Sequence, residues 1–207
     1  MIKISPSILG AKDRIDSIKK LNLTNAEYIH IDTMDGKFVP NTQMNIDEII
    51  TLEQNSKTPL DIHLMTENPI EYINQLENKN IKYITIHVEI DKDIHELINK
   101  IKQLGYKAGL SIKPNTSTLA ILPYIEKIDL VLIMSVEPGF GGQKFMPEAI
   151  EKAKQIKQLN KNIIIEMDGG INNINIKEIK PYVDIAVVGS YITNSNDYQE
   201  AINNLKN

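Results

Sequence analysis

"AEYIHIDTMDG" occupies residues 26–36 and joins the packing residues of a buried strand to ionisable side chains. Tyr28, Ile29 and Ile31 are typical of a strand, whereas His30 and Asp32 are costly to bury without partners. Because side chains alternate along a strand, His30 and Asp32 point to the same face. The segment therefore predicts a strand that carries chemistry at its carboxyl end.

Short runs like this one, rich in apolar and β-branched residues, recur along the chain. They cover residues 2–5, 28–32, 60–65, 83–88, 107–112, 130–134, 163–167 and 184–189. Between them lie segments with helical spacing of apolar residues, such as 68–80 and 93–105, and Gly105 is typical of a helix stop. Strands that are apolar throughout and alternate with helices indicate a parallel sheet covered on both faces.

Eight such units in 207 residues predict an α/β fold, a single-domain (β/α)8 TIM barrel over residues 1–207. An open, doubly wound sheet is the structural alternative. Its G-x-G-x-x-G fingerprint is missing after the first run, where the chain reads "SPSILGAKD", and this absence mildly favours the barrel.

Composition excludes several classes of function. A net charge of −4 and a pI near 5.6 give no basic footprint, so we expect no nucleic-acid partner and no binding to an anionic membrane. There is no cysteine, so a metal would have to use His, Asp or Glu, and a cysteine nucleophile is excluded. No signal peptide or membrane span is recognisable, and we expect a cytoplasmic protein.

Ionisable residues fall at the carboxyl ends of three predicted strands, where barrel enzymes place their reactive groups. These residues are His30, Asp32, His63 and Asp168. Imidazole and carboxylate ligands suit Zn²⁺, Fe²⁺, Mn²⁺ or Co²⁺. The alternative is that the histidines are core residues bonded to carboxylates. Burying four such groups without a metal or substrate would be costly, which favours a metal or substrate site over this alternative. His87 lies near the mouth and His95 within a helix, and neither is included in the set.

Glycine-bearing loops follow the last three predicted strands, at residues 136–145, 168–172 and 189–192. One such loop alone is typical of a surface turn. Three in adjacent units favour a phosphate site, because exposed backbone N–H groups can form an anion-binding concavity. A small phosphorylated substrate is therefore expected. Lys113, just past the fifth strand, is interpreted as a mouth or surface lysine, although a Schiff-base role is the alternative.

The motifs "SPSILG", "HIDTMDGKFVPN", "DIHLM", "ITIHVE", "SVEPGFGGQKF", "DGGI" and "VVGS" occur in this order. Together they resemble the ribulose-phosphate 3-epimerase family over nearly the whole chain. The resemblance implies a ribulose-phosphate-binding barrel with one divalent metal, which interconverts D-ribulose 5-phosphate and D-xylulose 5-phosphate in the pentose phosphate pathway. Family members are often homo-oligomers, and the same is expected here.

The resemblance also implies roles for individual residues. Asp32 and Asp168 would be the catalytic acid/base pair, and the metal ligands would be His30, Asp32, His63 and Asp168. The residues expected at the substrate are Ser7, His63, Gly139, Phe140, Gly141, Gly142, Gly169, Gly170, Gly189 and Ser190.

This assignment agrees with the chemistry of inverting a carbon next to a ketone. A proton must leave one face of C3 and return to the other, which requires two bases on opposite sides of the substrate. A metal bound to the C2 and C3 oxygens would stabilise the cis-enediolate and would favour the anionic form of both carboxylates. We expect one aspartate to act as base and the other as acid, with the roles exchanged in the reverse direction.

Several alternatives are kept. The nearest is a D-allulose 6-phosphate 3-epimerase, although the uninterrupted "GFGGQ" and "DGGI" favour the pentose substrate. Less favoured are a Schiff-base aldolase that uses Lys113 and a non-catalytic phosphosugar-binding barrel. "TQMNIDEI" after "FVPN" and the lysine of "SIKPNT" depart from the family pattern at the mouth loops and leave the ligand set intact.

Overall fold

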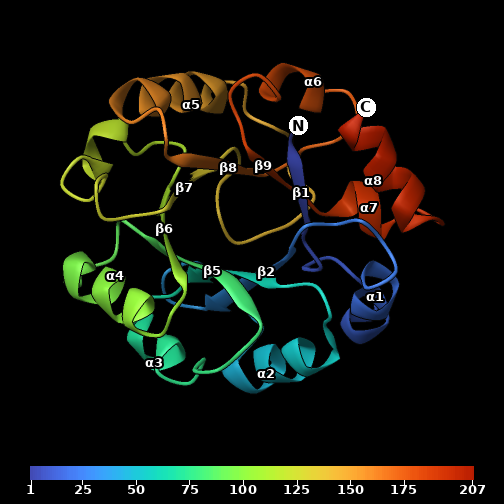
Figure 1. Ribbon diagram of the computed structural model, residues 1–207, viewed down its shortest axis with the longest axis horizontal. Helices are drawn as coiled ribbons and strands as arrows, with labels where there is room; N and C mark the ends of the chain where they lie inside the picture. The colour runs from blue at the N-terminus through green and yellow to red at the C-terminus, as the bar shows by residue number, and fades with distance from the viewer.

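The apolar runs of the sequence form one curled sheet in the computed structural model, which describes residues 1–207 (Figure 1). The parallel strands are β1 (Lys3–Pro6), β2 (Ile29–Asp35), β4 (Leu60–Met65), β5 (Ile81–His87), β6 (Lys107–Ile112), β7 (Leu130–Met134), β8 (Ile164–Asp168) and β9 (Ile185–Val188). Their order is β1-β9-β8-β7-β6-β5-β4-β2, and every neighbouring pair is parallel. A parallel bridge between Ser7 and His30 joins the first strand to the second and closes the ring. The predicted barrel is confirmed.

A short ninth strand was not predicted from the sequence. β3 (Thr42–Gln43) pairs antiparallel with the end of β2, where Met34 faces Gln43 and Asp35 faces Thr42. The chain reverses at Gly36, whose φ of +73° lies in the left-handed region that glycine adopts readily. This hairpin places the loop after β2 over the carboxyl end of the barrel.

Helical segments follow most strands and surround the barrel (Figure 1). They are α1 (Arg14–Leu21), α2 (Ile46–Asn55), α3 (Ile70–Ile73), α4 (Ile94–Gln103), the 3₁₀ helix η1 (Thr118–Ile121), α5 (Glu148–Leu159), α6 (Ile176–Ile179), α7 (Ser190–Thr193) and α8 (Tyr198–Lys206). None of them combines the length and the apolar composition that a membrane crossing requires.

Helix α4 forms where the sequence predicts it. The Asp93 side chain accepts a hydrogen bond from the Glu96 amide at 3.0 Å and caps the first turn. Leu97, Ile98 and Ile101 are buried against the barrel. Gly105, with φ +86°, ends the helical run as expected.

The helix expected over residues 68–80 is much shorter than predicted. Only α3 is helical, although Ile73 and Leu76 are fully buried as the spacing indicates. The amides of Gln75 and Leu76 donate to the carbonyls three residues back, and Asn78 adopts a left-handed φ of +57°. The apolar periodicity thus identified the buried face but overestimated the length of the helix.

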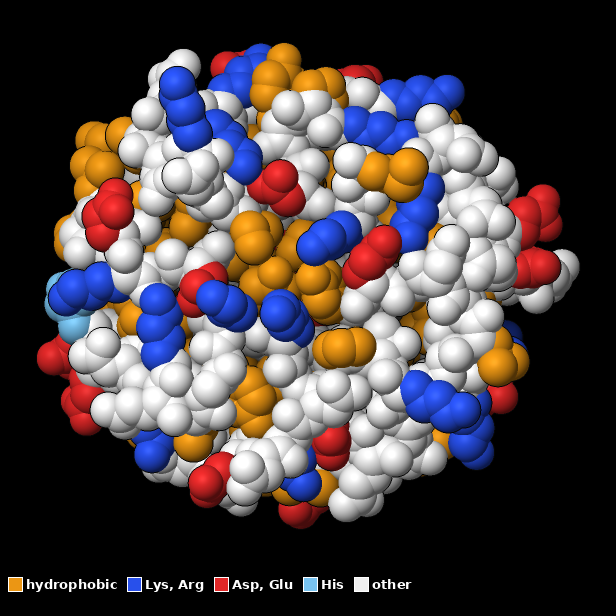
Figure 2. Space-filling model, viewed as in Figure 1, with side chains coloured by type: hydrophobic (Ala, Val, Ile, Leu, Met, Phe, Trp, Pro, Cys, Tyr) orange, Lys and Arg blue, Asp and Glu red, His pale blue; other side chains and the backbone are white.

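The hydrophobic core has three parts. The largest part consists mainly of isoleucine and leucine side chains between the strands and the surrounding helices. A smaller part includes Tyr28, Tyr83, Leu130 and Leu132, and the third consists of Met34, Val39 and Met65. On the face of the molecule seen in Figure 2, basic and acidic side chains are interspersed and hydrophobic side chains lie near the centre. That face therefore shows no patch of a single charge.

Candidate active site

Three strands of the barrel each carry two ionisable side chains two residues apart. The pairs are His30 and Asp32 on β2, Asp61 and His63 on β4, and Glu166 and Asp168 on β8. In the register of the sheet, His30 lies opposite Asp61 and Asp32 opposite His63. All are buried except Asp168, which is partly exposed. Because side chains two residues apart on a strand share a face, the six polar side chains lie together inside the barrel.

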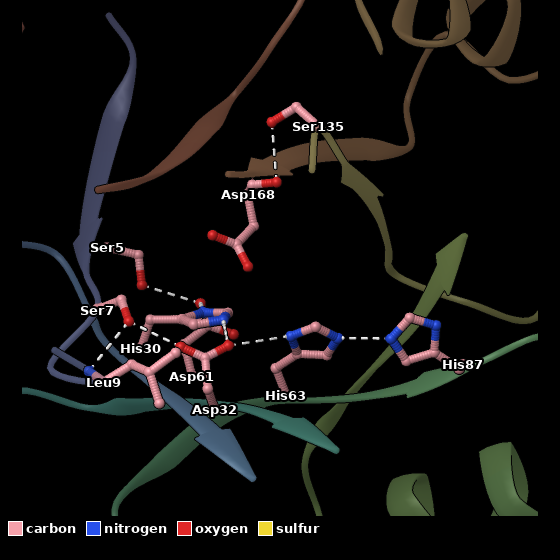
Figure 3. A network of polar contacts seen from close by, with 10 residues as sticks. All are labelled: Ser5, Ser7, Leu9, His30, Asp32, Asp61, His63, His87, Ser135 and Asp168. Atoms are coloured by element: carbon pink, nitrogen blue, oxygen red, sulfur yellow. Dashed lines mark hydrogen bonds and ion pairs between the residues drawn. The ribbon is translucent and has the colours of Figure 1, made fainter. Parts of the chain in front are cut away.

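Four of these side chains form the cluster predicted from the sequence (Figure 3). One ligand atom from each of His30, Asp32, His63 and Asp168 lies within 4.8 Å of the others. Asp32 Oδ1 is 3.3 Å from His30 Nε2 and 3.3 Å from His63 Nδ1. Ligand atoms bound about 2.1 Å from one metal ion lie roughly 3 Å apart, so the spacing suits a shared ion.

The hydrogen bonds of His30 agree with a metal site. His30 Nδ1 lies 2.8 Å from Asp61 Oδ2, and a carboxylate can only accept, so Nδ1 donates. His30 Nε2 is buried, has no hydrogen-bond partner and faces Asp32. A buried nitrogen in this position is well placed to bind a cation, and its partner on the other ring nitrogen is typical of metal-binding histidines.

The charged groups of the cluster change one another's pKa when no cation is bound. Burial opposes charge on His30, but Asp32 and Asp61 outweigh it and raise the pKa of His30 well above its usual range. Burial alone would raise the pKa of Asp32, yet the charge of His30 and the contact with its Nε2 hold that pKa below its usual value. Burial and the nearby Asp32 carboxylate raise the pKa of Asp168 to about 7. The two aspartates therefore differ in proton affinity despite their proximity.

Two serines hold the aspartates in place (Figure 3). Ser7 Oγ donates to Asp32 Oδ2 at 2.7 Å, which places this predicted substrate-binding serine at the cluster. Ser135 Oγ lies 2.8 Å from the backbone carbonyl oxygen of Asp168 and 2.8 Å from that of Gly169, and its one proton is shared between these two acceptors. The end of β8 is thereby fixed against the end of β7.

Asp61 and Glu166, which lie close to His30, were missed by the sequence analysis. Asp61 accepts hydrogen bonds from His30 and, at 2.9 Å, from Ser5 Oγ. Both oxygens of Glu166 are buried, and burial together with Asp61 raises the pKa of Glu166 well above its usual range. The signal was present in the sequence, because each residue precedes a predicted ligand by two positions and so shares its face.

His87 and Glu89 extend the polar network away from the cluster. His63 Nε2 lies 2.9 Å from His87 Nε2, and His87 Nδ1 lies 2.9 Å from Glu89 Oε2. Burial lowers the pKa of His87 to about 4. Burial would raise the pKa of Glu89, but the hydrogen bonds that it accepts from His87, the Lys113 amide and Thr116 lower that pKa to about 2. His87 is thus part of the site's support, whereas His95 lies on α4 beside Tyr124.

A cavity of about 430 Å³ opens beside the cluster. Most of the residues predicted to contact substrate line it, namely Ser7, Gly139, Phe140, Gly141, Gly142, Gly169, Gly170, Gly189 and Ser190, together with Asp32 and Asp168. His30 and His63 are fully buried and do not line it. The loop after β7 is held near the loop after β2 by a 2.9 Å hydrogen bond from Asn41 Nδ2 to the Gly139 carbonyl.

Lys113 does not line the cavity. Its Nζ lies 3.8 Å from the centre of the Phe38 ring, which is a cation–π arrangement. This placement agrees with the interpretation as a mouth or surface lysine and gives the Schiff-base alternative no structural support.

The barrel and this site define a (β/α)8 protein whose carboxyl-terminal mouth can hold a divalent cation beside a small cavity. Among solved structures, the fold matches a mutant tryptophan synthase alpha-subunit from Pyrococcus furiosus with a TM-score of 0.72 at 14% identity, covering 100% of this chain and 98% of the other. It also matches 3-hexulose-6-phosphate synthase from Salmonella typhimurium with a TM-score of 0.69 at 15% identity, covering 99% and 96%. At such identities these likenesses concern the fold alone.

Comparison of sequences is more specific. The model of the ribulose-phosphate 3 epimerase family matches residues 3–193. Ribulose-phosphate 3-epimerase from Helicobacter pylori strain J99 is 39% identical over 100% of this chain and 97% of its own length. The Bacillus subtilis enzyme of the same name is 36% identical, covering 100% and 99%. The chain therefore belongs to the ribulose-phosphate 3-epimerase family and is an epimerase.

Proposed function

We propose that this chain interconverts D-ribulose 5-phosphate and D-xylulose 5-phosphate by moving the proton at C3 between Asp32 and Asp168. The observation that carries the proposal is the placement of these two carboxylates in one cluster, on strands β2 and β8, with both lining the same cavity (Figure 3). A sugar bound between them would present one face of C3 to each carboxylate, as inversion requires.

His30, Asp32, His63 and Asp168 are the residues that would hold the metal. A divalent ion bound there, Zn²⁺, Fe²⁺, Mn²⁺ or Co²⁺, would act as a Lewis acid for the oxygens on C2 and C3 of the substrate. Asp32 is oriented for proton transfer by the hydrogen bond from Ser7, and Asp168 by the attachment of its backbone to Ser135. The methionines Met34, Met65 and Met134 line the cavity and give part of its wall an apolar surface.

The substrate phosphate would bind at the glycine-bearing loops. Gly139, Gly142, Gly169 and Gly170 have φ between +64° and +127°, a region that L side chains rarely adopt. Their backbone amides can approach an anion more closely than residues with side chains allow. The names of the relatives support a ribulose phosphate as the substrate. A homo-oligomeric state and a cytoplasmic location stay predictions.

The test is proton NMR in D₂O with metal-reconstituted protein. We expect deuterium to enter C3 of D-ribulose 5-phosphate while D-xylulose 5-phosphate appears, with slower exchange for D-allulose 6-phosphate. Faster exchange of the hexose phosphate would assign the allulose alternative. No exchange with either substrate, despite bound metal, would overturn the proposal. Borohydride trapping would then test the aldolase alternative.

Variants test the two carboxylates. Asp32→Asn and Asp168→Asn, each made alone, are expected to lower turnover by roughly 10²-fold or more, because each removes an acid/base group and a metal ligand. Turnover is to be expressed per bound metal ion, which separates loss of the base from loss of the metal. Asp91→Asn, at an exposed turn, is the matched control. Near-normal turnover of either site variant rules out the two-base assignment.

A further inference from the structure

His63, His87 and Glu89 form a series of hydrogen bonds that leads away from the cluster. The contacts of Glu89 determine which atom donates in each of these bonds. Glu89 Oε1 accepts hydrogen bonds from the Lys113 backbone amide at 2.7 Å and from the Thr116 hydroxyl. These donors identify the Glu89 side chain as an acceptor. Its other oxygen, Oε2, lies 2.9 Å from His87 Nδ1, so the imidazole must donate there.

The proton positions along the rest of the series follow. A neutral imidazole that donates through Nδ1 has an acceptor at Nε2. His87 Nε2 is 2.9 Å from His63 Nε2, so His63 Nε2 must carry the proton that joins the two rings. His63 Nδ1 is then left with its lone pair, and this atom faces Asp32 Oδ1 at 3.3 Å. Two acceptors facing each other at this distance favour a cation between them.

We propose that Glu89 and His87 are positioning residues that hold His63 in the tautomer with its proton on Nε2, so that Nδ1 is presented to the metal ion. The inference rests on the metal set of the proposed function. It extends that function by naming two residues outside the set that determine the state of one ligand.

His30 and His63 use opposite ring nitrogens for their outer hydrogen bond and for the metal site. His30 is held at Nδ1 by a direct 2.8 Å contact with Asp61 and presents Nε2. His63 is held at Nε2 and presents Nδ1, and its controlling carboxylate acts through a second imidazole. Each histidine of the cluster is thus set by one carboxylate outside the metal set, in opposite senses. Outer partners of this kind typically change metal affinity by roughly 10- to 100-fold.

The hydrogen bond between His63 and His87 is shielded from solvent. His63 and His87 are both fully buried. Their rings meet end to end at the 2.9 Å contact between the two Nε2 atoms, with centroids 5.0 Å apart and planes at 29°. The centroid of the Phe38 ring lies 4.6 Å from that of His87. A water molecule therefore cannot readily replace His87 as the acceptor for His63. We expect loss of the His87 side chain to change the protonation of His63 Nδ1.

The experiment compares His87→Leu, which removes both hydrogen bonds, with His87→Gln, whose amide can both accept and donate. His95→Leu, on α4, is the matched control. The first measurement is long-range ¹H–¹⁵N NMR of the His63 ring in metal-free protein at neutral pH. We expect the Nε2–H tautomer in the unaltered protein, in His87→Gln and in His95→Leu, and a shift toward Nδ1–H in His87→Leu, where Asp32 becomes the available acceptor.

The second measurement is the affinity for Zn²⁺ and for Mn²⁺, by competition with a chelator. We expect roughly 10- to 100-fold weaker binding for His87→Leu and for Glu89→Leu, with most of the affinity retained in His87→Gln. Thermal unfolding of each metal-free variant identifies any that fails to fold.

An Nδ1–H tautomer of His63 in the unaltered protein overturns the inference, as does an unchanged tautomer and affinity in both His87→Leu and Glu89→Leu. The NMR measurement needs neither metal nor turnover. If the tautomer shifts as expected and the metal-loaded protein exchanges no C3 proton, the proposed function fails while the positioning of His63 stands.

Discussion

Asp35, the second aspartate of residues 26–36, illustrates at the residue scale how a carboxylate next to the site can serve the fold instead. Its Oδ1 accepts from the amides of Lys37 and Phe38, each at 2.9 Å, and its Oδ2 from the amide of Glu67 at 2.7 Å. Burial would raise the pKa of Asp35, but these bonds lower it. The resulting stabilisation is present above the unfolded-state pKa of about 3.9 and is lost as the pH falls through the folded-state pKa.

Asp35→Asn is therefore expected to lower the free energy of unfolding by about 1–2 kcal/mol at pH 7, because one amide oxygen must serve three N–H donors. Urea unfolding of metal-free protein at pH 7 and pH 3 measures this. The difference in the free energy of unfolding between Asp35→Asn and the unaltered protein should be smaller at pH 3 than at pH 7. Asp91→Asn, at an exposed turn, should change little at either pH. A difference of equal size at both pH values would contradict the role assigned to the charged carboxylate.

Among the site residues, strand periodicity was enough to bring His30, Asp32, His63 and Asp168 together. The same periodicity would have indicated Asp61 and Glu166 had it been applied to all ionisable residues of the strands. Glu89 is different. It follows the end of β5, and no repeat in the sequence shows that its side chain turns back to His87 while receiving the amide of Lys113. The roles of all these residues stay predictions.

At the scale of the elements, the loops after β7 and β8 pack closely at Gly170. This residue has a φ of +64°, and a Cβ built on it would lie 2.5 Å from the Phe145 amide nitrogen and 2.7 Å from the Gln143 carbonyl oxygen. Both contacts are to backbone, so the neighbouring loop cannot yield by a side-chain rotation. We expect Gly170→Ala to lower the free energy of unfolding by more than about 2 kcal/mol, through left-handed strain and steric overlap together.

Gly142→Ala is the matched comparison, because Gly142 has a φ of +75° but no atom within 4 Å of the added Cβ. It should show the backbone strain alone, about 1–2 kcal/mol. Urea unfolding of the two variants separates the contributions. Equal losses in both would mean that the loops do not depend on the close approach at Gly170.

The sequence predicted elements unevenly for physical reasons. Strands buried on both faces have an apolar pattern that does not depend on their neighbours, and all eight were located. Helices that cover a barrel need only a few buried residues, so α3 and α6 are single turns and η1 is a 3₁₀ helix. The two-residue strand β3 has no pattern of its own, because its pairing with β2 depends on the turn at Gly36.

At the scale of the whole molecule, the number of βα units predicted the barrel but not how it closes. β1 pairs with β9 along its whole length, whereas only the bridge from Ser7 to His30 joins it to β2. We call the place where β1 meets β2 the seam. At the end of the seam away from Ser7, Glu27 bonds to Ile4 in place of the hydrogen bonds that a paired β1 and β2 would make. Its amide donates to the Ile4 carbonyl at 3.2 Å, and its Oε2 accepts from the Ile4 amide at 3.0 Å. A side chain thus takes part in closing the barrel, and a strand pattern cannot reveal such a contact.

Glu27 also ties the seam to the last helix, because its Oε1 lies 2.8 Å from Lys206 Nζ of α8. We expect Glu27→Ala to lower the free energy of unfolding by about 1–3 kcal/mol, since the buried Ile4 amide loses its acceptor. Faster hydrogen exchange of that amide should accompany the loss and mark the seam as the place where the barrel opens. Both quantities can be measured on the same metal-free protein, by urea unfolding and by exchange followed with NMR.

Two further variants decide whether the acceptor or the charge of Glu27 closes the barrel. Glu27→Gln keeps an acceptor for the Ile4 amide and should retain most of the protection from exchange. Glu151→Ala removes an ion pair with Lys154 on the exposed surface of α5 and should cost no more than about 0.5 kcal/mol. If Glu27→Ala leaves exchange of the Ile4 amide unchanged, the bridge from Ser7 to His30 and the helix packing are sufficient to close the ring. If Glu27→Gln is as unstable as Glu27→Ala, the charge that faces Lys206 matters more than the hydrogen bond.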